Sequence, residues 1–179
     1  DYVRSNICGS CHQKTFKEWK ATQMEDTCQD CHMPRKKGRL TQKAGFNLLH
    51  KKKWVGDHRF LHGEIKENDV VMESGWEENF FLISLKNQTI PHFVPTADNG
   101  DPRLYLYIKF FNEAGEEVDN AKEIIAPQQE TALPYNKKMR YRYRLFDKII
   151  KAEVELKYQP AWSKEKDLVW EKTVHRKIK

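Results

Sequence analysis

The chain has 179 residues, of which 39% are hydrophobic and 32% charged, and its formal net charge is +6. A chain of this length fits one domain or two small ones. No apolar run approaches the roughly 20 residues that a membrane-spanning helix needs, so we expect no integral membrane segment.

The first feature along the chain is a short motif that occurs twice, as CGSCHQ at residues 8–13 and as CQDCHMPRKK at residues 28–37. C-x-x-C-H is the attachment signature of a c-type haem. The two thiols bond to the vinyl groups of the porphyrin, and the histidine that follows gives its imidazole to the iron. The doubled motif therefore predicts two covalently bound haem c groups. They would be held by Cys8, Cys11 and His12 and by Cys28, Cys31 and His32.

The four cysteines also fit three other interpretations. A zinc ribbon also uses two C-x-x-C pairs, but it does not require a histidine after each pair. A thioredoxin-like redox site expects one such pair in a βαβ setting. A pair of structural disulfides would leave both histidines without a role. Two haems give a role to all four cysteines and to both histidines that follow them.

Residues 1–70 carry both motifs and many charged residues, with little apolar periodicity. We expect helical stretches at residues 11–24 and near residues 31–37. The segment has too little aliphatic mass for a core, and two haems would supply the missing apolar surface. Because haem attachment follows export, we expect a removed signal or an absent upstream segment before residue 1 and a periplasmic or extracellular location.

From about residue 76 the sequence is typical of strands. Ala152, Val154, Leu156 and Tyr158 alternate with charged residues, and residues 139–146 alternate tyrosine with arginine. The denser runs at 79–87 and 103–111 look like central strands. We predict an α+β fold, in which a small, mostly irregular or helical dihaem segment (1–70) is followed by an antiparallel immunoglobulin-like β-sandwich (71–162). Residues 163–179 form a charged tail that is either an edge strand or a helix.

Four segments together resemble a family of multihaem c-type cytochromes: residues 8–24, CQDCHMPR at 28–35, DHRFLHG at 57–63 and PHFVPT at 91–96. In that family a haem-bearing segment precedes a β-sandwich, and members transfer electrons, often within a longer haem chain. The chain departs from the family at Pro91 and Ala97, where many members have glycine. It also has Met24 five residues after Trp19, where many members have histidine.

The sixth ligands of the two irons decide what the haems can do. The resemblance and the position of His58 favour it as one distal ligand, and His92, between stiffening prolines, is the second candidate. Met24 and His62 are the alternatives. His50 is a weaker candidate, and His175 in the charged tail is expected at the surface.

If both irons carry six ligands, the protein is an electron-transfer carrier or relay with redox partner proteins, alone or within a multihaem complex or filament. The alternative is a haem enzyme with one open iron site for a small nitrogen or sulfur compound. A third hypothesis is a binding module with structural haems. The lysine-rich runs at 35–37 and 51–53 suggest nucleic-acid binding, but we favour a solvated face that attracts an acidic partner and expect no nucleic acid.

Overall fold

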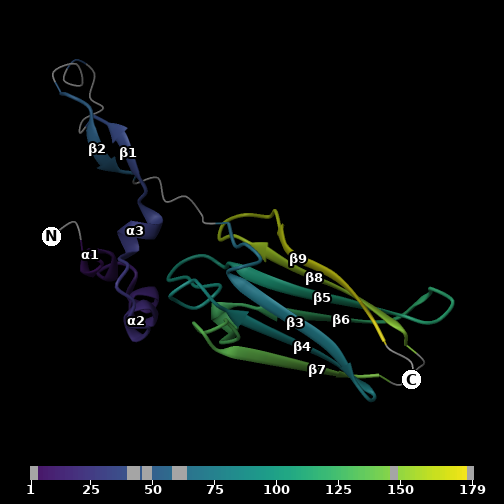
Figure 1. Ribbon diagram of the computed structural model, residues 1–179. Coiled ribbons are helices and arrows are strands. Elements are labelled where there is room, and N and C mark those ends of the chain that lie inside the picture. The colour runs from purple at the N-terminus through teal and green to yellow at the C-terminus, as the bar shows by residue number, and fades with distance from the viewer. Residues whose placement is uncertain (1–3, 40–44, 46–49, 58–63, 146–148, 177–179) are drawn as a thin grey trace.

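The computed structural model describes residues 4–39, 45, 50–57, 64–145 and 149–176. The described structure contains three antiparallel sheets, and three short helices precede the two larger sheets (Figure 1). The helices are α1 (Asn6–Gly9), α2 (Gln13–Ala21), α3 (Cys28–His32) and the 3₁₀ turn η2 (Pro127–Gln129). The strands are β1 (Arg35–Gly38), β2 (Lys53–Gly56), β3 (Val70–Glu77), β4 (Phe80–Asn87), β5 (Arg103–Phe111), β6 (Glu117–Ile125), β7 (Lys138–Arg144), β8 (Lys151–Gln159) and β9 (Asp167–His175).

One hydrophobic core lies between the two larger sheets, whose strand orders are β3-β4-β7 and β6-β5-β8-β9. The expected alternation is confirmed in β8, where Ala152, Val154 and Leu156 are fully buried. In β7 the tyrosines face inward and the arginines are exposed. The two dense runs are central strands as predicted, because β4 pairs on both sides in its sheet and β5 does in the other.

The tail, for which the sequence left strand or helix open, contains β9. This strand pairs with β8 at the edge of the four-stranded sheet. Val169 is buried in the core, and Trp170 donates a hydrogen bond from its indole nitrogen to the Val70 carbonyl at 2.6 Å. These contacts attach the strand to both larger sheets.

The predicted fold class is wrong. The described residues are mostly β, with 45% in strands, 14% in helices and three antiparallel sheets, and do not form a helical or irregular dihaem segment followed by an immunoglobulin-like sandwich. The helix expected near residues 31–37 ends at His32, because the residue before Pro34 is disfavoured in helical conformation. Residues 35–38 are instead extended and pair with residues 53–56 as the two-stranded sheet β1-β2, which projects away from the larger sheets (Figure 1).

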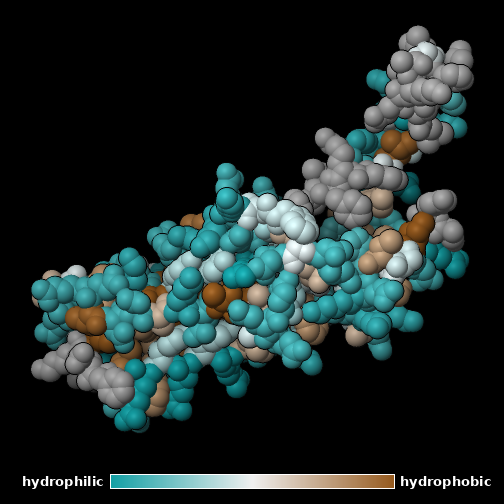
Figure 2. Space-filling model, turned by 180° about the vertical axis from the view of Figure 1, so that it is seen from behind, coloured by the Kyte–Doolittle hydropathy of each residue, from teal (hydrophilic) through white to brown (hydrophobic). Residues whose placement is uncertain are grey.

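The surface of the chain is largely hydrophilic on the face shown in Figure 2, with separated apolar side chains. Among the described residues, the most exposed large hydrophobic side chains are Trp162 at 82%, Trp54 at 63% and Leu168 at 53%. Within the same residues, no helix is both long enough and apolar enough to cross a membrane.

Candidate functional site

The second C-x-x-C-H motif forms the single-turn helix α3. Thr27 caps it: its hydroxyl accepts the Asp30 N–H at 3.3 Å, and the Asp30 carboxylate accepts the Thr27 N–H at 2.7 Å. Residues three apart on a helix share a face. The capped turn therefore places Cys28 and Cys31 side by side, with His32 at its end.

The first motif is wound in a similar turn that begins in α1. The His12 N–H donates to the Cys8 carbonyl at 2.8 Å, which is the spacing of an α-helical turn. Gly9 lies against Phe16, and a Cβ at this position would come within 2.7 Å of the ring. A side chain there would push the motif away from α2, so this close approach requires glycine.

The two motifs pack against each other. Ser5, which precedes the first motif and is only 3% exposed, accepts the Cys28 N–H at 2.9 Å. Burial raises the pKa of the Cys8 thiol, and the nearby Cys28 thiol raises it further. A pair of haems held here would therefore lie near each other.

The four cysteines are free thiols, which disagrees with the structural-disulfide interpretation. No group of three or more His, Cys, Asp or Glu among the described residues is arranged to hold a metal ion. The thiols thus do not converge on one tetrahedral point as in a zinc ribbon. A haem iron, by contrast, takes only two protein ligands.

His32 and His92 face each other across the boundary between the motifs and the larger sheets. Their ring centroids are 6.2 Å apart, and their planes are inclined by 19°. A metal–imidazole bond is about 2 Å long and the ligating nitrogen lies about 1 Å from its ring centre, so two imidazoles on opposite sides of one metal have centres about 6 Å apart. A haem held here would have both imidazoles close to its iron, so the residues present at this place fit a haem.

The protonation of His92 also suits a metal ligand. Its Nδ1 lies 2.8 Å from the Phe93 carbonyl, which can only accept, so Nδ1 carries the hydrogen. Burial lowers the pKa of the His92 imidazole, and the nearby His32 lowers it as well. The neutral ring therefore presents the lone pair of Nε2. The pKa of His32 is also lowered, by desolvation and by the nearby His12, although this residue is exposed at the surface.

Asn87, at the end of β4, fixes the turn that carries His92. This side chain is fully buried. Its amide nitrogen donates to the Ile90 carbonyl at 3.0 Å and to the His92 carbonyl at 2.6 Å, and its oxygen accepts the Ile90 N–H at 3.2 Å. The main chain at His92 is thus anchored to the core.

The loop after His92 binds helix α2. Glu18 accepts the Phe93 N–H at 3.1 Å and the Thr96 hydroxyl at 2.7 Å. Asp98 accepts the Lys14 N–H at 2.8 Å and the Thr15 hydroxyl at 3.0 Å. Burial raises the pKa of Asp98, but these hydrogen bonds outweigh it and the pKa lies below its usual value, so the carboxylate is ionised at neutral pH. The loop thus connects α2, which follows the first motif, to His92, which faces His32 of the second motif.

The other predicted ligands are placed differently. His58 and His62 lie outside the described residues, so the structure does not place either of them. The Met24 sulfur accepts the Tyr135 hydroxyl at 3.7 Å, which places this thioether against the segment between η2 and β7. His50 and His175 are exposed.

Glu18, Asp98 and Asn87 were not predicted from the sequence. Each forms hydrogen bonds that exist only in the folded chain. Those of Glu18 and Asp98 join residues that are 75 to 84 positions apart in the sequence. The only signal in the sequence was the segment PHFVPT at 91–96, whose Thr96 donates one of these hydrogen bonds to Glu18.

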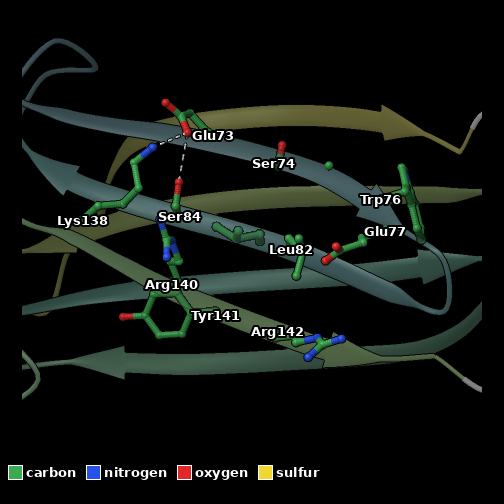
Figure 3. Close-up of a pocket in the computed structure, with 12 residues that line it drawn as sticks. Glu73, Ser74, Trp76, Glu77, Leu82, Ser84, Lys138, Arg140, Tyr141 and Arg142 are labelled. Atoms are coloured by element: carbon green, nitrogen blue, oxygen red, sulfur yellow. Dashed lines mark hydrogen bonds and ion pairs between the residues drawn. The ribbon is translucent and has the colours of Figure 1, made fainter.

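A separate hollow of about 680 Å³ lies on the three-stranded sheet (Figure 3). It is lined by residues of β3, β4 and β7, and none comes from either motif. Glu73 in this hollow forms an ion pair with Lys138 at 2.6 Å and accepts a hydrogen bond from Ser84 at 3.3 Å. The Glu73 carboxylate is thus already paired with Lys138 and Ser84. We therefore place the candidate functional site at the two motifs and His92.

Comparison with known proteins reveals a structural likeness only. No family model matches the chain. No curated protein matches it either. Among solved structures, the chain is similar to a penta-haem cytochrome c552 from Thermochromatium tepidum, with a TM-score of 0.62 at 18% sequence identity. The match covers 97% of this chain and 56% of that cytochrome. The chain therefore has a fold like that of a multihaem c-type cytochrome.

Proposed function

We propose that the chain is a dihaem c-type cytochrome segment that transfers electrons. Each haem would be attached through the two thiols of one motif, at Cys8 and Cys11 and at Cys28 and Cys31. A bound haem supplies a one-electron redox centre, and the chain's own side chains attach it, ligate it and set its environment.

The observation that carries this proposal is the His32–His92 pair, with ring centroids 6.2 Å apart. The two residues come from segments 60 positions apart, one in a haem motif and one anchored by a buried side chain. With the four porphyrin nitrogens, two histidine ligands would fill all six positions of an iron and leave none open for a substrate. This haem is therefore assigned to electron transfer rather than to catalysis.

The remaining assignments are extensions of the same proposal. His12 is the proximal ligand of the first haem, and His58 is its distal ligand, with Met24 and His62 as alternatives. Residues 1–70 are the haem-binding unit, and residues 71–162 together with β9 form the unit that supplies His92. Redox proteins of a periplasmic or extracellular compartment are the proposed partners. Support comes from the similarity to a multihaem cytochrome, of which the chain spans 56%.

The test is the mass and the electron paramagnetic resonance spectrum of the purified protein. Two attached haems should add about 1.2 kDa, the mass of two porphyrins bound through thiols. Replacing His92 with alanine should convert one haem from low spin to high spin while both haems remain attached, because the thioether bonds are untouched.

The matched control is His175→Ala, which removes an exposed imidazole from β9 and should leave the spectrum unchanged. A protein without covalent haem would overturn the proposal. A high-spin haem in the unmodified protein that shifts on adding nitrite would favour the haem enzyme instead.

A further inference from the structure

Asp98 lies where the larger sheets meet the start of α2, and its side chain is only 12% exposed. Its Oδ1 accepts the Lys14 N–H at 2.8 Å, and its Oδ2 is 3.4 Å from the Thr15 N–H and 3.0 Å from the Thr15 hydroxyl. The same Oδ2 lies 3.8 Å from Nδ1 of His12. One carboxylate therefore faces both a helix terminus and a motif histidine.

The contacts with Lys14 and Thr15 are those of a helix cap. The residue at the cap position of α2 is His12, and its side chain makes no capping hydrogen bond. A capping side chain normally accepts the N–H of the second or third helical residue, and a negative charge there is favoured by the helix dipole. Asp98 performs both tasks from a position 84 residues later in the chain.

The contact with His12 has a different consequence. Histidines that ligate a metal through one ring nitrogen commonly direct the other N–H at a carboxylate or carbonyl, which fixes the ring and raises its basicity. At 3.8 Å the Asp98 oxygen is within ion-pair range of Nδ1, although longer than a hydrogen bond. The carboxylate therefore lies on the Nδ1 side of the ring.

We propose that Asp98 is a positioning residue for the first haem: it orients His12 from the helix cap and lowers the reduction potential of the iron that His12 binds. This inference rests on the proposed function, since it assigns His12 to a haem. A negative charge near the iron stabilises the ferric state, which carries one more positive charge than the ferrous state.

The test is the midpoint potential of each haem in the Asp98→Asn variant, measured by optical redox titration of the protein with both haems attached. Asparagine is nearly the same size and also caps helices, so the variant removes the charge and keeps the cap. We expect reduction of one haem to become about tenfold more favourable, a positive shift of about 59 mV for a one-electron couple, while the second haem changes little.

Two matched variants separate this effect from general electrostatics and from stability. Asp101→Asn removes the same charge three residues away, where the carboxylate pairs with Arg103. Thr15→Val removes a hydroxyl that contacts Asp98 but leaves the charge in place. Neither variant should shift a potential by more than a small fraction of the Asp98→Asn effect. If asparagine prevents folding, Asp98→Ser, which is also a good cap, takes its place.

The outcomes are distinct. Equal potentials in Asp98→Asn and the unmodified protein, with two haems present, would refute the role of Asp98 and leave the proposed function intact. Equal shifts in Asp98→Asn and Asp101→Asn would also refute it. Absence of haem from the unmodified protein would refute the proposed function itself.

Discussion

Asn87 links the core to the turn that presents His92, and its replacement with alanine should destabilise the protein measurably. The side chain is fully buried and forms three hydrogen bonds to the backbone of residues 90 and 92, at 3.0, 2.6 and 3.2 Å. Alanine can form none of them. The variant also leaves buried main-chain groups at Ile90 and His92 without this partner.

The expected loss follows from these contacts. A hydrogen bond in a protein contributes about 1 kcal/mol net, so three contribute about 3 kcal/mol. Small rearrangement or entry of water would reduce the loss, and unsatisfied buried groups would increase it. We therefore expect the free energy of unfolding to fall by about 2 to 4 kcal/mol.

Urea unfolding followed by circular dichroism measures this free energy. The control is Asn120→Ala in β6, where the asparagine is exposed and the change should be within about 0.5 kcal/mol. A loss at Asn87 no larger than that of the control would show that the hydrogen bonds around the His92 turn do not stabilise the fold, and the assignment of Asn87 as its anchor would be withdrawn.

Three further predictions concern the loop, the tyrosines and the core. Glu18→Ala should lower stability by about 1 to 3 kcal/mol in urea unfolding, because the Phe93 N–H and the Thr96 hydroxyl lose their acceptor; a neutral result would mean that the loop holds α2 without it. Burial raises the pKa of Tyr141 to about 12. The folded state therefore keeps this proton while an unfolded tyrosine loses it near pH 10, so stability should fall as pH rises from about 10 towards 12, and ultraviolet titration of Tyr141→Phe should lack this late ionisation. Leu106→Ala, at a fully buried position in β5, should cost about 2 to 5 kcal/mol in unfolding free energy, whereas Leu168→Ala on the exposed side of β9 should cost far less.

The strands of the two larger sheets were predictable because their signal is local. Ala152, Val154 and Leu156 alternate with charged residues, and the period of two identifies the buried face without knowledge of the partner strand. The two-stranded sheet β1-β2 has no such alternation of apolar and charged residues. β1 contains only arginine, lysine and glycine, and β2 adds only Trp54 and Val55 as strand formers. The pairing of the two strands depends on residues about 18 positions apart. The overall class was wrong for the same reason, since α3 ends at His32 and the chain after Pro34 is extended.

The residues predicted to attach the haems were readable because their chemistry depends on spacing along the chain. The C-x-x-C-H pattern names both thiols and the histidine within five positions. The residues that position these groups are not readable in this way. Glu18 and Asp98 each act on a segment 75 or more residues distant, so only the fold shows the contact. His92 is intermediate, because the flanking prolines marked its segment while its facing partner became visible only in three dimensions.

Because Asp98 caps helix α2, the helix can be completed only after a much later part of the chain is present. A chain that emerges N-terminus first, from a ribosome or an export channel, exposes Lys14, at the start of α2, 84 residues before the carboxylate that caps this helix. At synthesis rates of about 5 to 20 residues per second, this interval lasts on the order of ten seconds. During this interval Cys8 and Cys11 lie beside a helix that still lacks its cap. Under the proposed function, the haem of the first motif would be attached to a segment that the later strands have not yet enclosed.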